Sequence, residues 1–184
     1  MDSYLKQYIN GKWVDSIGGK RHEVISPSTE EPCTEITLGT QADVDAAVAA
    51  AKEAFKTAKG KYVAPSQIEN KLGAHGYIEA CCVAGNGFPQ PFAMLMLSPA
   101  AAAKCAEEGG RDAVGSVLAA LREQVNTTLD PHERLDRLIV VPDAWTVDNG
   151  MVTPTFKVKR AALEARYGAA FEGWAARSET VIWA

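Results

Sequence analysis

The sequence predicts an α+β fold: a small compact domain of short strands covered by helices, preceded by an appendage of a β-hairpin and a helix. Three observations predict it. Apolar runs at residues 78–84 and 92–97 are bounded by glycine and proline, as is typical of buried strands. Apolar residues recur at helical spacing over residues 112–127. The acidic excess lies in residues 1–55, which hold 5 Lys and Arg against 9 Asp and Glu, whereas residues 56–184 hold 14 of each. We therefore expect two parts that meet near residue 55.

A hairpin is predicted across residues 7–16. Asn10 and Gly11 lie between β-prone residues, and both central positions of a tight two-residue hairpin turn need positive φ. A further strand is predicted at residues 21–25, followed by a polar loop bounded by prolines. The start of this segment is therefore expected to be β-structure.

A helix follows in the first segment. Thr40 followed three residues later by Asp43 is a relative of the capping box that opens many helices. The expected apolar stripe consists of Val44, Ala47, Val48, Ala51 and Phe55.

The second segment alternates short strands and helices. The turn Gly85-Asn86-Gly87-Phe88-Pro89 separates the two apolar runs, and Asn149-Gly150 predicts another turn. The remaining predicted elements are strands at 61–64 and 138–141 and helices at 66–72, 99–108 and 159–167. Strands and helices in this arrangement predict one small layered domain.

The cysteines do not predict a metal site or a disulfide framework. Cys81 and Cys82 are adjacent within an apolar run, and Cys33 and Cys105 each stand alone. The sequence has no C-x-x-C spacing and no histidine at ligand distance from a cysteine. We expect all four cysteines to act as small buried apolar residues, and we expect no metal ligands.

The composition also excludes several classes of partner. The second segment is neutral, whereas a nucleic-acid-binding domain needs a basic face. Ser98, Pro99 and Lys104 interrupt the longest apolar stretch, so no membrane span is expected. The first residues lack a basic lead followed by an apolar run, so the expected location is the cytoplasm.

The first segment resembles the N-terminal edge of the aldehyde dehydrogenase family. The match rests on Tyr8-Ile9-Asn10-Gly11-Lys12-Trp13, Ser26-Pro27-Ser28-Thr29 and Ala42-Asp43-Val44-Asp45-Ala46-Ala47-Val48. In that family this edge precedes the dinucleotide-binding and catalytic parts. Neither a glycine-rich phosphate turn nor a cysteine in the family's nucleophile setting is found in this sequence, so dehydrogenase activity with NAD is the least favoured function.

The second segment resembles the C-terminal small domain of the adenylate-forming enzymes, in particular the long-chain acyl-CoA synthetases. One block comprises residues 55–65 and continues into Ile68-Glu69-Asn70. The other comprises residues 149–160, Asn-Gly-Met-Val-Thr-Pro-Thr-Phe-Lys-Val-Lys-Arg. Residues 83–85 and 138–141 occupy the expected strand positions between them. The resemblance implies ATP-dependent adenylation of a fatty acid followed by thioester formation with coenzyme A.

The resemblance also implies roles for particular residues. Lys157 matches the catalytic lysine that reaches the acyl carboxylate and the α-phosphate of ATP, where a cation offsets the repulsion between two anions. Gly60 matches the loop that faces the acyl-adenylate during thioester formation. Lys59 and Lys61 are candidate contacts for coenzyme A phosphates. Lys52 and Glu53 match the hinge on which the small domain swings.

The site is expected to be incomplete within this sequence. In the family, ATP and its Mg²⁺ bind to a large domain, and nothing in residues 1–55 resembles that domain. The expected partner is an adenylating large domain or a second copy of the chain, and ATP or coenzyme A is not expected to bind tightly to this chain by itself.

Other interpretations remain open. Without the resemblance, Lys157, Lys159 and Arg160 would be interpreted as a solvated basic loop that enters a helix, and Lys56, Lys59 and Lys61 as an exposed strand edge protected by charge. The alternative function is a non-catalytic fusion product or an anion-binding module. We expect the first segment to be poorly ordered, or to dock on the small domain or on a second copy.

Overall fold

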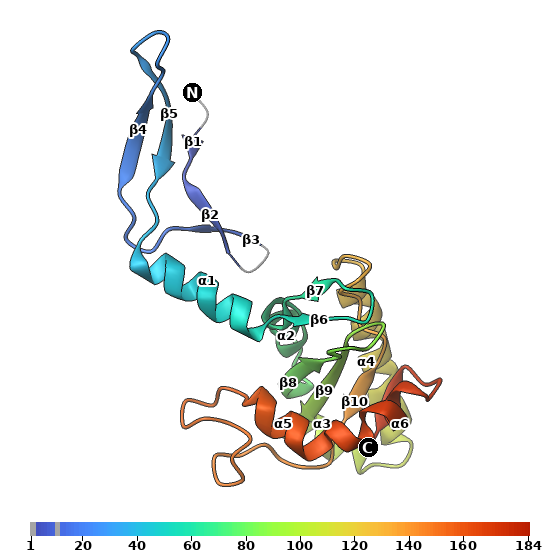
Figure 1. The fold of residues 1–184 in the computed structure, drawn as a ribbon. Helices are drawn as coiled ribbons and strands as arrows, with labels where there is room; N and C mark the ends of the chain where they lie inside the picture. The colour runs from blue at the N-terminus through green and yellow to red at the C-terminus, as the bar shows by residue number, and fades with distance from the viewer. Residues whose placement is uncertain (1–2, 10–11) are drawn as a thin grey trace. The chain divides into compact units, whose positions relative to one another are not determined.

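The protein folds as two compact units, Met1–Ala54 and Phe55–Ala184. The computed structural model describes residues 3–9 and 12–184. Both units contain helices and strands, so the α+β prediction is confirmed (Figure 1).

The first unit begins with the predicted hairpin. Strand β2 (Lys6–Ile9) pairs antiparallel with β3 (Lys12–Asp15). The turn residues Asn10 and Gly11 lie outside the described residues. Tyr8 and Trp13 face each other across the hairpin with ring centroids 5.3 Å apart, and both remain exposed.

A small sheet accompanies the hairpin. It has three strands in the order β1-β5-β4, namely β1 (Ser3–Tyr4), β5 (Pro32–Thr37) and β4 (Arg21–Ile25). Strand β5 was not predicted, because its first residue is a proline and its apolar pattern is weak; a proline is nevertheless tolerated at the first position of a strand. Ser26 N–H donates to the Glu31 carbonyl (2.9 Å) and closes the turn between β4 and β5.

Helix α1 (Gln41–Glu53) starts with the predicted cap. The Thr40 side chain accepts from the Asp43 N–H, and the Asp43 carboxylate accepts from the Thr40 N–H. The prediction that Phe55 ends the apolar stripe of this helix is wrong. Ala54 adopts an extended conformation, and Phe55 begins strand β6.

The second unit contains a four-stranded sheet in the order β11-β10-β9-β8, made of β8 (Ile78–Ala84), β9 (Phe92–Leu97), β10 (Leu138–Val140) and β11 (Val181–Trp183). Strands β9, β10 and β11 run parallel, and β8 runs antiparallel to β9. The carboxyl ends of three strands therefore meet at one edge of the sheet.

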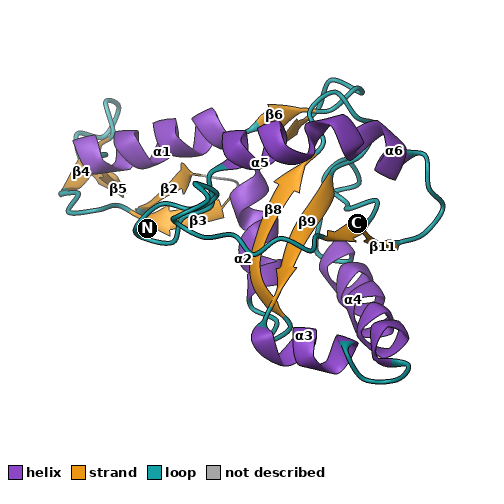
Figure 2. Cartoon of the chain, turned by 90° about the horizontal axis from the view of Figure 1, so that it is seen from below, coloured by secondary structure: helices purple, strands orange, loops and turns teal. Residues whose placement is uncertain are grey.

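Helices cover both faces of this sheet (Figure 2). The helices are α2 (Pro65–Gly73), α3 (Pro99–Cys105), α4 (Gly110–Asn126), α5 (Arg160–Tyr167) and α6 (Phe171–Ala175). Alternate strand residues face opposite layers. Val83 and Leu95 pack with α2 and α4, whereas Cys82 and Met94 pack with α5 and α6. Strands buried on both faces carry continuous apolar runs, which is the pattern seen in the sequence.

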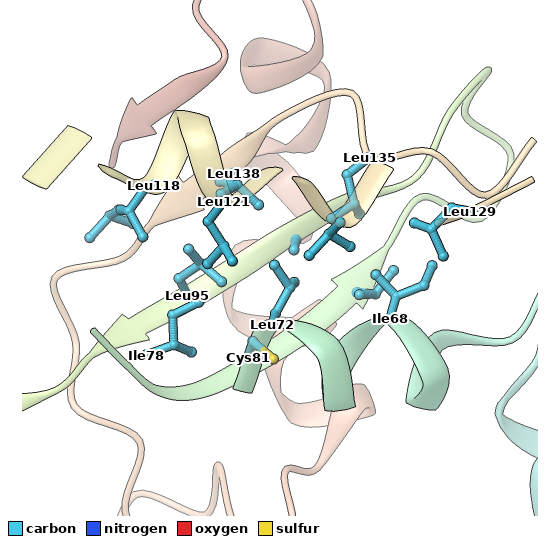
Figure 3. Packing of buried hydrophobic residues seen from close by; sticks show 14 of the residues in the cluster. Ile68, Leu72, Ile78, Cys81, Leu95, Leu118, Leu121, Leu129, Leu135 and Leu138 are labelled. Carbon is cyan, nitrogen blue, oxygen red and sulfur yellow. The ribbon is translucent and has the colours of Figure 1, made fainter. Parts of the chain in front are cut away.

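The first of these layers forms the larger core. Ile68 and Leu72 of α2 and Leu118 and Leu121 of α4 belong to one buried cluster with Leu95 of the sheet (Figure 3). Burial of side chains of this size stabilises the fold by about 1.5–3 kcal/mol each. This layer holds α2 and α4 against the sheet.

Some boundaries differ from the sequence prediction. Helix α3 ends at Cys105 and not at 108, and α4 begins at Gly110 because Gly109, with φ 69°, caps it. Helix α6 and strand β11 had no counterpart in the prediction, since each is very short.

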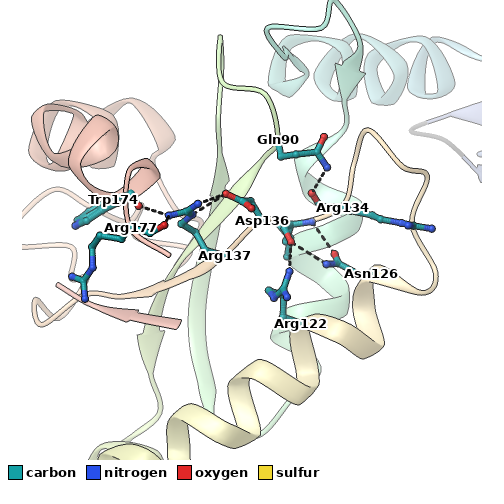
Figure 4. A network of polar contacts seen from close by, with 9 residues as sticks. Gln90, Arg122, Asn126, Arg134, Asp136, Arg137, Trp174 and Arg177 are labelled. Carbon is teal, nitrogen blue, oxygen red and sulfur yellow. Dashed lines mark hydrogen bonds and ion pairs between the residues drawn. The ribbon is translucent and has the colours of Figure 1, made fainter. Parts of the chain in front are cut away.

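A network of hydrogen bonds joins the segment before β10 to α4 and to the end of α6 (Figure 4). Asn126 is buried and exchanges two hydrogen bonds with the Leu135 backbone, at 2.8 and 2.9 Å. The Arg137 guanidinium is also buried and donates to the carbonyls of Trp174 and Arg177. The buried polar side chains of Asn126 and Arg137 are thus hydrogen-bonded, as burial of polar groups requires.

The cysteine prediction holds for two of the four residues. Cys81 and Cys82 are buried, and burial raises the pKa of each thiol to about 12. Cys105 is half-buried, however, and Cys33 is exposed, because its short strand has no layer packed over that side chain. In the described part of the chain, no helix is long and apolar enough to cross a membrane.

Candidate functional site

Lys157 lies on a tight hairpin loop that precedes α5. Val152 and Val158 form an isolated antiparallel bridge, and between them Thr153 N–H donates to the Lys157 carbonyl (2.8 Å). Phe156 N–H donates to the Thr153 carbonyl (2.8 Å), which closes a turn with Pro154 at its second position. Proline fixes φ near the value that this position needs.

The Thr153 side chain fixes the position of Lys157 in this loop. Its Oγ1 accepts from the Lys157 N–H at 3.0 Å and also contacts Thr155 Oγ1 at 2.9 Å. The backbone of Lys157 is therefore held on both sides by one residue, while its side chain is exposed.

Phe156 has a strained backbone next to Lys157. Its φ is 58°, and its side chain is 79 % exposed. A bulky residue with positive φ is a conformational outlier, and such strain concentrates at sites where the chain must present a particular group.

Arg160 anchors the end of the loop. It donates to Glu69 Oε1 on α2 at 2.7 Å and to the Val83 carbonyl at the end of β8. The same Glu69 oxygen accepts from the Val83 N–H at 2.8 Å. Both side chains are about four-fifths buried, at 22 and 20 % exposure, so the pair is shielded from water. Glu69 thus holds the residue that follows Lys157 by three positions.

Gly60 lies in a second tight turn, between β6 (Phe55–Lys56) and β7 (Tyr62–Val63). Its φ is 76°, and its N–H donates to the Thr57 carbonyl (2.9 Å). A Cβ at this position would meet only Lys56 Cε, at 3.7 Å. Glycine is needed here because of the positive φ, since a side chain would have enough space.

Hydrogen bonds between Thr57 and the backbone of Lys61 hold this turn together. It is buried, its N–H donates to the Lys61 carbonyl (2.9 Å), and its Oγ1 accepts from the Lys61 N–H (3.3 Å). Lys59 and Lys61 are exposed on either side of Gly60. The turn therefore presents two cations beside a bare stretch of backbone.

Both loops are tethered near the carboxyl end of β8. Ala58 N–H donates to the Phe88 carbonyl and Gly87 N–H to the Lys56 carbonyl, each at 2.9 Å, which fixes the Gly60 turn to the β8–β9 connection. Arg160 holds the Lys157 loop to Val83, at the end of the same strand. Two blocks that are far apart in the sequence are thus connected through one strand end.

The candidate hinge residues belong to the other unit. Glu53 is the last residue of α1, and Lys52 precedes it, with its side chain outside the described part. The division between the units falls after Ala54. Among the described residues, no group of three or more His, Cys, Asp or Glu side chains is placed to hold a metal ion.

The comparisons with known proteins decide the family of the second unit. The model of the family described as AMP-binding enzyme C-terminal domain matches residues 53–179. The chain belongs to this family.

Solved structures support this assignment. The AMP-binding C-terminal domain is similar to the adenylation domain of a carboxylate reductase from Mycobacterium chelonae, with TM-score 0.61 and 25 % identity. A carboxylic acid reductase A domain from Segniliparus rugosus, in complex with AMP and a co-purified carboxylic acid, gives TM-score 0.56 and 26 % identity. The similarity covers 69 % and 68 % of this chain but 20 % of each of those chains.

Most of the first segment lies within a match to the model of the aldehyde dehydrogenase family, which spans residues 13–68 and so extends into the second segment. The chain is 51 % identical over 55 residues to a putative aldehyde dehydrogenase from Staphylococcus aureus (strain bovine RF122 / ET3-1) and 47 % identical over 53 residues to aldehyde dehydrogenase 1A1 from Gallus gallus. The chain spans 12 % and 10 % of the length of these relatives. Segments similar to two enzyme families are therefore joined, as the sequence predicted.

Sequence reasoning gave no role to Glu69 or Arg160, although both lie in the blocks that carry the resemblance. Their opposite charges were a signal, but residues 91 positions apart cannot be paired from sequence alone.

Proposed function

We propose that residues 55–184 serve as the mobile small domain of a fatty acyl-CoA synthetase. In the adenylation step, a carboxylate oxygen attacks the α-phosphorus of ATP, an acyl–O–P bond forms, and pyrophosphate leaves. In the second step, the coenzyme A thiol loses its proton and its sulfur displaces AMP from the acyl carbon, which forms the thioester. The match to the AMP-binding C-terminal domain family carries this proposal.

Lys157 is the catalytic residue of the proposal. Its loop is held by Thr153 and anchored by Arg160, so the ammonium group is presented from a supported exposed hairpin. A lysine ammonium that lies between a carboxylate and the α-phosphate lowers their mutual repulsion as they approach. This arrangement supports a role in the first step.

The Gly60 turn would act in the second step. Its bare backbone permits close approach of an acyl-adenylate, and the exposed ammonium groups of Lys59 and Lys61 suit the phosphates of coenzyme A. ATP, with its Mg²⁺, would bind to an adenylating large domain supplied by a partner. Lys52 and Glu53 would provide the hinge.

A second candidate is adenylation for a carboxylic acid reductase. The structures that support it are the adenylation domains described above, and one related structure from Segniliparus rugosus is an A-PCP didomain in complex with AMP. The first step is common to both candidates. They differ in the thiol that receives the acyl group.

The test uses the purified full chain with ATP, Mg²⁺, coenzyme A and palmitate, alone and mixed with a synthetase large domain that lacks its own small domain. Adenylate formation is measured by pyrophosphate release, and thioester formation is measured separately. We expect activity only in the mixture. Lys157→Ala should abolish adenylate formation, and Lys159→Ala, an exposed lysine two positions away, serves as the matched control.

Three outcomes separate the candidates. Thioester formation with coenzyme A, lost in Lys157→Ala, supports the synthetase. Adenylate formation without transfer to coenzyme A, but with transfer to a carrier-protein thiol, supports the reductase-type reaction. If the folded chain binds the large domain yet yields no adenylate, the proposal is wrong and a non-catalytic or anion-binding module remains.

A further inference from the structure

A cavity of about 470 Å³ lies at the edge of the sheet where the parallel strands end. Met96 and Leu97 come from the end of β9, Val141 and Pro142 follow β10, and Trp183 ends β11. In sheets of this kind, ligands bind in the crevice outside the carboxyl ends of the strands. The volume is also within the range of ligand pockets, about 300–1,000 Å³.

This cavity is separate from the candidate functional site. The Gly60 turn is bonded to Gly87 and Phe88, in the connection that precedes the amino end of β9. The cavity lies beyond the carboxyl end of β9, next to α3. Figure 2 shows α3 and β6 at opposite ends of β8 and β9.

The cavity wall is mainly apolar, with three charged side chains and with the last residue of the sequence, Ala184, at its edge. The charge of Asp143 is already balanced, because its carboxylate accepts from the Tyr167 hydroxyl (2.8 Å) and from Arg166 (3.0 Å). These two hydrogen bonds lower the pKa of Asp143, and the bond from Tyr167 has the larger effect. Glu79 is exposed on β8. The third charged residue, Arg111, supplies a cation.

Arg111 is held over the aromatic part of the wall. Its guanidinium carbon lies 5.1 Å from the centroid of the Trp183 ring. A cation–π contact engages the charge of the guanidinium and the face of the ring. The contact does not use the guanidinium N–H donors, which can therefore bind a carboxylate in bidentate fashion.

The backbone determines where Arg111 lies. Gly109 and Gly110 form the sharp junction between α3 and α4, and Arg111 follows in the first turn of α4. The amino end of this 17-residue helix adds partial positive charge beside the guanidinium. Asp112, the next residue, lines a neighbouring groove together with Arg177 and does not line the cavity.

We propose that this cavity binds a small aromatic or short-chain carboxylate. The apolar body lies against Met96, Val141 and Trp183, and the carboxylate binds to the Arg111 guanidinium. This site is independent of the proposed ligase function, because it shares no residue with the Lys157 and Gly60 loops.

The test measures binding of 2-naphthoate to the full chain by ligand-detected saturation-transfer NMR and by calorimetry, with neutral 2-naphthalenemethanol as the matched ligand. Arg111→Gln should weaken naphthoate binding about tenfold, the effect of losing one charge-assisted hydrogen bond. It should leave binding of the alcohol unchanged. Arg134→Gln, in the loop near the opposite end of the sheet, is the matched charge control.

A second pair of variants tests the location. Ala102 lines the cavity on α3 and is exposed, so Ala102→Leu should fold normally and weaken both ligands by occupying space. Ala103→Leu, on the same helix but outside the lining, should have no effect. The proposal is overturned if naphthoate does not bind to the folded protein at millimolar concentration. It is also overturned if the alcohol binds as tightly as naphthoate, or if Arg111→Gln or Ala102→Leu leaves naphthoate binding unchanged.

Discussion

At the scale of single residues, two acidic side chains each join segments that are far apart in the sequence. Glu69 joins α2, β8 and the loop that carries Lys157. Asp43 does the same in the first unit, where it connects the start of α1 to the backbone that follows β3. Each accepts several hydrogen bonds, which makes it costly to replace.

Replacing Glu69 by alanine should destabilise the second unit by about 2–3 kcal/mol, because the change leaves the Arg160 charge and the Val83 N–H without this acceptor. Glu69→Gln should cost less, since its amide oxygen can still accept from Val83. Urea unfolding measures both, and Glu107→Ala, an exposed position, should stay within about 0.5 kcal/mol of the parent. Equal stability of Glu69→Ala and Glu107→Ala would contradict the anchoring role.

Asp43 should make the first unit sensitive to acid. Hydrogen bonds from the Ser16 hydroxyl (2.5 Å), the Ile17 N–H (2.9 Å) and the Thr40 N–H (2.8 Å) lower the pKa of Asp43 to about 2. Because the unfolded chain takes up this proton at higher pH, the stabilisation is present above about pH 4 and is lost as pH falls toward 2.

The amide resonances of Ile17 and Thr40, followed from pH 6 to pH 2, measure this titration. We expect a midpoint near the lowered pKa of Asp43 and no such transition in Asp43→Asn. A midpoint near pH 4 would show that these hydrogen bonds do not form in solution.

At the scale of elements, the connections carry the special backbone conformations. The loop of Lys157 places Phe156 at φ 58°, the loop of Gly60 places that glycine at φ 76°, and the junction of α3 with α4 places Gly109 at φ 69°. These connections set the positions of Lys157, of the Gly60 turn and of Arg111, respectively. Within the strands, the pairing is interrupted by a register shift between Val24 and Ile25 of β4 and by another between Ile78 and Ala80 of β8.

Two glycines of α4 should respond to alanine in opposite ways. A Cβ on Gly110 would lie 1.8 Å from the Lys104 carbonyl oxygen, so Gly110→Ala should destabilise the protein by about 2 kcal/mol or more. A Cβ on Gly115 would meet only Trp183 Nε1, at 3.9 Å, so Gly115→Ala should stabilise α4 by about 0.5–1 kcal/mol. Thermal unfolding of the two variants measures the difference. A Gly110→Ala variant as stable as the parent would show that the α3–α4 junction is not tightly packed, and a destabilised Gly115→Ala would contradict the helix-propensity argument.

At the scale of the whole molecule, the two units differ in their cores. Among the described residues, every buried hydrophobic side chain lies between Val63 and Ile182, within the second unit. The described large hydrophobic side chains that remain exposed in the first unit are Tyr8, Trp13, Ile17, Ile25, Leu38, Val44 and Val48. Local stability follows the burial of apolar side chains, so the first unit should open more readily than the second.

Hydrogen exchange tests this difference. In a dilute sample, amides of β8 and β9 should exchange at least about tenfold more slowly than amides of β2 and β3, because only the former belong to a packed core. The measurement is repeated at tenfold higher protein concentration to detect a second copy. Equal protection in dilute solution would contradict the expected low stability of the first unit, whereas protection that rises with concentration would support docking on a second copy.

Local patterns in the sequence determined much of this architecture. The capping pair Thr40 and Asp43, the β2–β3 hairpin and the apolar runs of β8 and β9 were predictable, because each depends on neighbouring residues and on a regular period. The likeness to two enzyme families was also readable, since motif residues lie in short blocks. Lys157 and Gly60 were named as candidates for the same reason, and their roles stay predictions.

Only the tertiary structure decided the rest. Phe55 leaves the helical stripe and pairs with Val63, and β11 forms at three residues by pairing with β10, because strand pairing outweighs weak local preference. Cys33 is exposed because no layer covers that side chain of its short strand. The bond between Glu69 and Arg160 and the cavity beside Arg111 depend on strand order, which no short window of sequence contains. Sequence determines which local elements form when the signal is periodic, whereas the folded chain decides which charges meet and where an apolar surface stays open.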